Sequence, residues 1–160
     1  MDKISFFFDK ARKQAAAAGK RGEVPVGAVL VDSRTNTLLA TFGNRTKELA
    51  DPTAHAELLC LRKGAGSERN AQLVFCDLYV TLEPCAMCAS AIAFARIRRL
   101  YFGAYDPKGG GVDHGPRIFE QPTCHHHPEV YGGIDEEQCK ALLTNFFRDR
   151  REEKHNTQSK

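Results

Sequence analysis

The 160-residue sequence contains no long apolar run. Near its start, the only candidate, Ile4 to Phe8, is interrupted by Ser5 and stops at Asp9 and Lys10. A signal-peptide core or a membrane-spanning helix needs a longer stretch of apolar residues. We therefore expect no secretion and no membrane partner, and a cytoplasmic location.

The sequence also lacks a strong charge bias. It has 23 Lys and Arg against 20 Asp and Glu, which gives a net charge of +3. An excess of this size does not by itself indicate nucleic-acid binding. The excess is concentrated in residues 91–117, where five Lys and Arg stand against two Asp. A modest basic face near these residues is expected.

Internal repeats and interdomain linkers are absent as well. The composition, with 42% hydrophobic and 27% charged residues, is ordinary for a soluble enzyme. We therefore expect a single domain over residues 1–160, with a flexible tail after about residue 151.

Helices and strands alternate along the chain. Helical spacing of apolar residues predicts helices at about 3–18, 54–62, 84–95 and from 135 to about 151. Short apolar segments predict strands at 24–31, 38–41, 78–82 and 100–103, with a short edge strand at Val130 and Tyr131. The first two strands are separated by a short polar turn and should form an antiparallel hairpin. The pattern predicts an α/β fold, a three-layer α/β/α sandwich with a mixed five-stranded sheet.

Helix ends can be predicted from capping and breaking residues. Gly19 is placed to end the first helix, Thr53 to cap the second, and Gly64-Ala65-Gly66 to break it. Pro84 fits the first turn of the third helix. Asp135 with Gln138 resembles a capping box for the last helix.

Two short motifs carry the chemistry: His55-Ala56-Glu57 and Pro84-Cys85-Ala86-Met87-Cys88. One imidazole and two thiolates fill three positions of tetrahedral zinc and leave the fourth for water, as in a catalytic site. Cys85 and Cys88 are three residues apart and share a helix face. Glu57, close to His55, is placed to carry protons between this water and a substrate.

A closed structural zinc site is the main alternative to this interpretation. Such sites usually have four protein ligands, and one His with a single Cys-x-x-Cys is one ligand short. The other four cysteines do not pair at a second ligand spacing. The pattern therefore favours catalytic zinc.

The two motifs together resemble the cytidine deaminase-like superfamily of zinc deaminases. From about Phe6 to Arg151 the chain is similar to the bacterial tRNA-specific adenosine deaminases within it. Two further segments, Asp106 to Gly110 and Phe146 to Arg148, narrow the resemblance to these tRNA enzymes.

This resemblance implies a cytidine deaminase-like fold, one Zn²⁺ per subunit and a homodimer. It implies hydrolytic deamination of adenosine to inosine at wobble position 34 of a tRNA anticodon, in an arginine tRNA, with the nucleotide flipped into the pocket. The roles carried over by position are the zinc ligands His55, Cys85 and Cys88, the proton carrier Glu57, and the substrate-binding residues Asn44, Val26, Ala54, Asp106, Lys108, Phe147 and Arg148.

Several of these residues also have simpler interpretations. Asn44 could stabilise a loop as an Asx-turn, Asp106 could serve only turn formation, and Phe147 could be a core residue. The run Cys124 to His127 could bind a second metal, although adjacent residues seldom converge on one ion; a loop near RNA is the favoured interpretation.

Two rival functions remain open at this point. One is a deaminase of a free base or nucleotide, of the guanine or cytidine type. The other is a non-catalytic, zinc-stabilised RNA-binding module, which would not need a proton carrier at Glu57.

Overall fold

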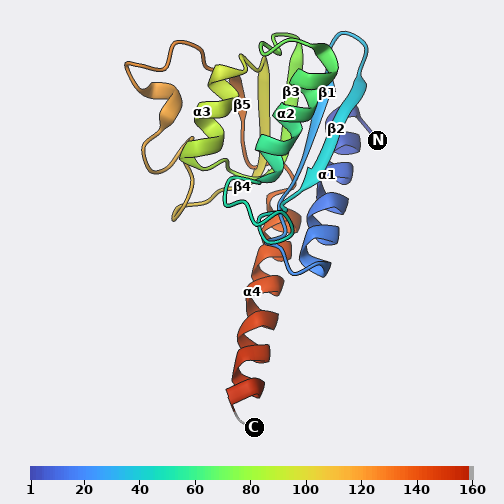
Figure 1. The fold of residues 1–160 in the computed structure, drawn as a ribbon, viewed down its shortest axis with the longest axis vertical. Coiled ribbons are helices and arrows are strands. Elements are labelled where there is room, and N and C mark those ends of the chain that lie inside the picture. The colour runs from blue at the N-terminus through green and yellow to red at the C-terminus, as the bar shows by residue number, and fades with distance from the viewer. Residues whose placement is uncertain (159–160) are drawn as a thin grey trace.

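The structure is a computed structural model and describes residues 1–158. A five-stranded sheet lies between two layers of helices (Figure 1). The elements in chain order are α1 (Lys3–Lys20), β1 (Gly27–Asp32), β2 (Thr37–Gly43), α2 (Ala56–Glu68), β3 (Cys76–Leu82), α3 (Ala86–Phe94), β4 (Arg99–Ala104), a 3₁₀ turn (Ile118–Glu120), β5 (Glu129–Tyr131) and α4 (Glu136–Gln158).

The sheet is mixed, with strand order β2-β1-β3-β4-β5. β1 is antiparallel to both of its neighbours, whereas β3, β4 and β5 run parallel. The predicted hairpin, the edge strand and the three-layer α/β/α sandwich are all confirmed.

Each face of the sheet has its own apolar core. One core packs α2 and α3 against strand residues such as Leu30, Leu78 and Phe102. The other packs α1, through Phe7 and Phe8, against the opposite face. Burying one such side chain contributes about 1.5–3 kcal/mol, so the two cores fix the sheet between the layers.

One edge of the sheet gathers the functional segments, and we call it the site edge. It consists of Gly27, where β1 begins, and of Gly43, Leu82 and Ala104, where β2, β3 and β4 end. The segments leading into α2 and α3 start from this edge, which brings the two zinc motifs side by side.

Four predicted ends of the first three helices are wrong. α1 continues through Gly19 to Lys20, α2 begins at Ala56 rather than after Thr53, and α3 begins at Ala86, so that Pro84 precedes the helix. α2 also runs through Gly64 to Glu68. A Cβ on Gly64 would lie 2.2 Å from Leu30 Cδ2, so this glycine allows the helix to approach the sheet instead of ending it.

The last helix departs from the sequence prediction in two ways. Asp135 has a φ of 49° and its carboxylate lies 3.7 Å from Arg12 Nη1, which is not the geometry of a capping box with Gln138. α4 is also continuous to Gln158, where fraying after Arg151 was predicted. It extends beyond the site edge, away from the sheet (Figure 1), and only Cys139 on it is buried.

Among the described residues, no helix combines the length and apolar character needed to cross a membrane.

Candidate active site

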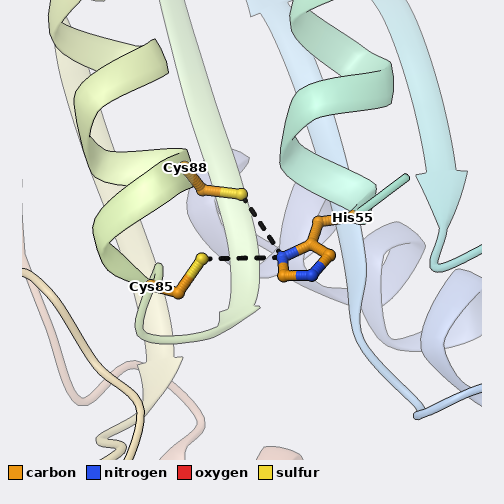
Figure 2. A group of neighbouring side chains, drawn as sticks. All are labelled: His55, Cys85 and Cys88. Carbon is orange, nitrogen blue, oxygen red and sulfur yellow. Dashed lines mark hydrogen bonds between the residues drawn. The ribbon is translucent and has the colours of Figure 1, made fainter. Parts of the chain in front are cut away.

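His55, Cys85 and Cys88 converge at the site edge (Figure 2). His55 Nδ1 lies 3.6 Å from Cys85 Sγ and 3.5 Å from Cys88 Sγ. His55 and Cys85 are the N-cap residues of α2 and α3, and both have extended backbone conformations. Because His55 lies outside the regular helix, its side chain and that of Glu57 need not point apart as residues i and i+2 on a helix would.

These three donor atoms fit a zinc ion without rearrangement. Tetrahedral zinc, at about 2.3 Å from sulfur and about 2.05 Å from nitrogen, places the sulfur and nitrogen atoms about 3.6 Å apart. The observed separations match this value. Nδ1 of His55 is therefore the nitrogen placed to ligate, and the donor set fits one Zn²⁺.

The two thiols are electronically unequal before any ion binds. A hydrogen bond from Cys88 and a further one with His55 lower the pKa of Cys85 to about 4, while the same interaction with Cys85 raises the pKa of Cys88. The hydrogen bond with Cys85 raises the pKa of His55. Of the two thiols, the one at the N-cap of α3 is therefore the more acidic, and the thiolate is the form that ligates metal.

Glu57 lies in the first turn of α2 and is only 4% exposed. Burial raises the pKa of its carboxyl above the ordinary value, and it interacts electrostatically with His55 and both thiols. A carboxyl group with a raised pKa beside a metal site is suited both to take up and to release a proton.

Asn44 is anchored at the same place. Its Oδ1 accepts a hydrogen bond of 2.8 Å from the backbone N–H of Ala56, one of the N–H groups that a helix leaves unpaired at its start. The contact spans twelve residues, so it is not an Asx-turn. This hydrogen bond fixes the orientation of the Asn44 side chain at the start of α2.

Val26 and Ala54 lie directly before β1 and shortly before α2, respectively. Both side chains are buried, at 5% and 0% exposure. Their backbones are tied to the loop after β2, since Val26 O accepts from Asn44 N–H and Ala54 O accepts from Arg45 N–H. The side chains of Val26 and Ala54 therefore offer apolar surface rather than polar contacts.

The loop that carries Asp106 and Lys108 is built by turn chemistry. Asp106 Oδ1 accepts hydrogen bonds from the backbone N–H groups of Lys108 and Gly109. Lys108 itself is exposed. The loop returns to the zinc motif, where Gly111 N–H donates to Pro84 O at 2.8 Å.

Glu83, which the sequence interpretation did not assign a role, organises this loop. Its carboxylate is 2% exposed and accepts backbone hydrogen bonds from Asp106, Val112, Asp113 and His114 at 3.0–3.2 Å. It also accepts from His114 Nδ1 at 2.8 Å. Burial acts to raise the pKa of Glu83, but the hydrogen bonds outweigh it and hold this pKa below its ordinary value.

A second buried glutamate, Glu23, was also missed. It is 1% exposed and accepts from the backbone N–H groups of Lys47 and Glu48 and from Thr46 Oγ1. The sequence did contain a signal for such residues, namely a glutamate directly beside an apolar strand, as in Leu82-Glu83-Pro84. A carboxylate buried at such a position needs hydrogen-bond donors around it.

Phe147 and Arg148 lie near the middle of α4. Phe147 is 47% exposed, so it is not a core residue. Arg148 pairs with Asp149 at 3.6 Å.

The run Cys124 to His127 does not form a second metal site in the described part of the chain. The group of three ligands described above is the one cluster found there with metal-binding geometry. Cys124 Sγ donates to the backbone O of His126, and His126 Nε2 lies 2.8 Å from Ile97 O, so both ligand atoms are engaged by the backbone.

Comparisons with known proteins agree with this geometry. Residues 1–104 match the family described as the cytidine and deoxycytidylate deaminase zinc-binding region. The tRNA-specific adenosine deaminase of Agrobacterium fabrum (strain C58) is 53% identical over 152 residues, covering 94% of this chain and 98% of that protein.

Two solved structures are similar as well. One, described in studies of A-to-I editing by tRNA:A34 deaminases at the wobble position of transfer RNA, is 53% identical, with a TM-score of 0.84, covering 87% of this chain and 99% of that one. A guanine deaminase from Bacillus subtilis is similar over less of its length: 34% identity, a TM-score of 0.60, and 63% of this chain and 64% of that one.

Proposed function

This chain belongs to the zinc-binding cytidine and deoxycytidylate deaminase family and, within it, to the tRNA-specific adenosine deaminases, and we propose that it deaminates adenosine to inosine at wobble position 34 of a tRNA anticodon. The reaction adds water at C6 of adenine and releases ammonia. The observation that carries the proposal is the zinc-fitting set His55, Cys85 and Cys88, together with the buried Glu57 in the first turn of α2.

Each catalytic group has a defined task. His55, Cys85 and Cys88 would hold the zinc ion, whose Lewis acidity would lower the pKa of the attacking water. Glu57 takes a proton from that water, delivers it to the purine ring nitrogen, and then helps to protonate the departing amine. Its buried position suits both steps because the group must be a base first and an acid later within one turnover.

Substrate selection rests on residues around the ligands. Asn44 Nδ2 donates to the flipped nucleotide, while Val26 and Ala54 bound the base. Asp106 and Lys108 meet the neighbouring nucleotides, and Phe147 with Arg148 contacts RNA farther out. An anticodon loop is already single-stranded, so flipping its nucleotide costs little. We further propose an arginine tRNA as substrate, a homodimer as the active form, and a cytoplasmic location.

One assay separates this function from its rivals. The purified protein is incubated with an anticodon stem-loop that carries adenosine at the wobble position and, separately, with free adenosine, cytidine and guanine. Inosine formed only in the stem-loop is the expected result. Turnover of free guanine, the activity named for the Bacillus subtilis structure, would overturn the proposal, and binding without turnover would indicate a non-catalytic module.

The variant Glu57→Ala tests the proton carrier. Turnover should fall by at least about 10²-fold because general acid-base catalysis is removed. Zinc content and stem-loop affinity should remain those of the wild type. Loss of zinc from this variant would show instead that Glu57 is a metal ligand.

A further inference from the structure

His114 supplies the one side-chain donor among the five hydrogen bonds that the Glu83 carboxylate accepts within residues 1–158. Its Nδ1 lies 2.8 Å from Glu83 Oε1. The pKa of Glu83 is held below its ordinary value, so at neutral pH its carboxylate only accepts, and Nδ1 carries the proton. The other four donors are backbone N–H groups, which every residue except proline offers. The imidazole is therefore the part of this anchor that depends on the identity of a loop residue.

The two oxygens of Glu83 hold different ends of the loop. Oε2 accepts from three consecutive residues, 112–114, at 3.0–3.2 Å. Oε1 accepts from the backbone N–H of Asp106 at 3.0 Å and from the His114 imidazole. The beginning and the end of the loop thus meet at one oxygen atom. Removing the imidazole leaves Oε2 with all its donors, so the effect of its removal falls on the Asp106 end.

A ring contact sets the orientation of the imidazole. The His114 ring lies edge-on to the ring of Tyr105, with centroids 6.1 Å apart and an interplanar angle of 74°. Tyr105 itself meets the buried Phe102 of β4 edge-on at 5.1 Å. Edge-to-face contact is a favourable geometry for aromatic rings, and this line of rings ties His114 to the sheet. Since Tyr105 directly precedes Asp106, the ring contact and the hydrogen bond act on the same end of the loop.

The Asp106 end carries the turn that a substrate would meet. Asp106 Oδ1 accepts from two backbone N–H groups of this turn, so the direction of the turn follows from the placement of Asp106. Lys108 is exposed on it. The loop contacts the zinc motif elsewhere, from Gly111 N–H to Pro84 O at 2.8 Å. Loss of the imidazole should therefore disturb the turn and leave the metal ligands in place.

We propose that His114 is a positioning residue for substrate recognition. Through Glu83 Oε1 it holds Asp106, and with it Lys108, in the orientation that meets the nucleotides beside the target adenosine. The proposal rests on the proposed function for the identity of those nucleotides. It assigns His114 to recognition rather than to metal binding, because the imidazole shares its acceptor atom with the Asp106 end of the loop.

Three variants separate the hydrogen bond from the ring contact. His114→Asn places an amide N–H close to the position of Nδ1, His114→Phe keeps a ring against Tyr105 without a donor, and His114→Ala removes both. The control is Ser33→Ala, which removes a side-chain hydrogen bond to Phe75 O beyond the other end of β1. Zinc content, stem-loop affinity, and kcat and KM for inosine formation are measured for each variant.

His114→Ala should raise the KM for the wobble-adenosine stem-loop about 5-fold, the effect of losing one hydrogen bond. Its kcat at saturation and its zinc content should equal those of the wild type, because the lost contact serves the ground state and the transition state equally. His114→Phe should resemble His114→Ala, whereas His114→Asn should bring KM back to within about 2-fold of the wild type. Ser33→Ala should leave KM unchanged.

Four results would overturn the assignment. They are an unchanged KM in His114→Ala, a loss of zinc from this variant, an equal rise of KM in the Ser33→Ala control, and recovery of KM by His114→Phe but not by His114→Asn.

A double-mutant cycle with Asp106 tests whether His114 acts through that residue. Once Asp106→Ala has removed the turn, His114 has nothing left to position, so His114→Ala/Asp106→Ala should have the KM of Asp106→Ala to within about 2-fold. Two independent effects would multiply instead. Multiplication would contradict the positioning role, because it would mean that His114 contributes to KM without Asp106.

The two proposals fail differently. Amide hydrogen exchange of residues 105–109 needs no RNA and should be faster in His114→Ala and His114→Phe than in the wild type and His114→Asn. If the wild type forms inosine but the variants change neither exchange nor KM, only the His114 assignment is wrong. If the variants alter exchange and stem-loop affinity as expected but no inosine forms, only the proposed reaction is wrong. If the wild type does not bind the stem-loop, both are wrong.

Discussion

Two buried glutamates hold two loops at the site edge, but the lengths of chain that their hydrogen bonds span are different. Glu23 stands before β1 and receives donors from three consecutive residues, 46–48. Glu83 stands after β3 and receives donors from both ends of a loop, residue 106 and residues 112–114. Glu83 is also two residues from the zinc ligand Cys85, whereas Glu23 has no ligand beside it in sequence. We infer that Glu83 joins loop shape to the metal-binding segment, while Glu23 holds only the loop after β2.

The largest effect is expected for Glu83→Ala. Four backbone N–H groups and one imidazole would lose their acceptor, so the free energy of unfolding should fall by about 3 kcal/mol. Turnover should drop at least about 10-fold, with reduced zinc content, because the segment that presents Cys85 loses its support. Denaturant unfolding, metal analysis and inosine formation measure the three quantities.

Glu83→Gln is the matched control for this variant. Its amide keeps one acceptor oxygen and should restore part of the lost stability and zinc content. If Glu83→Ala has normal zinc content, the loop and the metal are independent, and the contrast between the two glutamates disappears.

A smaller effect is expected for Glu23→Ala. Fewer donors lose their partner, and the free energy of unfolding should fall by roughly 1–2 kcal/mol. The KM for the stem-loop should rise several-fold because the loop after β2 is no longer held, while zinc content and kcat stay unchanged. A lowered zinc content in this variant would make the two glutamates equivalent.

The smallest effect is a pH dependence specific to Glu83. Its hydrogen bonds place its pKa in the folded protein below the ordinary 4.5. The stability that this carboxylate contributes is therefore fully present above about pH 4.5 and is lost as pH falls through the folded pKa. The difference in unfolding free energy between wild type and Glu83→Gln should shrink over this acidic range. A constant difference would contradict the assignment.

The features that depend on short local patterns could be predicted from the sequence. The zinc ligands occur as two compact motifs, and the strands and helices follow short periodicities, so both the donor set and the three-layer fold could be derived without coordinates. Helix boundaries were less accessible: Gly64 resembles a helix breaker until Leu30 is seen to pack against it.

The structural roles of Glu23 and Glu83 could not be predicted from the sequence, for a different reason. Their partners are backbone N–H groups 23 to 31 residues away, and a backbone donor leaves no mark in the sequence. The direction of α4 was similarly hidden, since helical spacing predicts a helix but not how much of it packs against the sheet, and only Cys139 on it is buried.

Because both glutamates hold their loops through main-chain donors, loop shape is largely independent of the exposed loop side chains. Lys47, Glu48 and Asp113 each contribute an N–H to the anchor and direct an exposed side chain elsewhere. Any residue except proline offers the same N–H. These positions can therefore diverge in evolution, or be randomised in a library, while the loops keep their form. The fold separates the part of the surface that can change its RNA preference from the part that performs the chemistry.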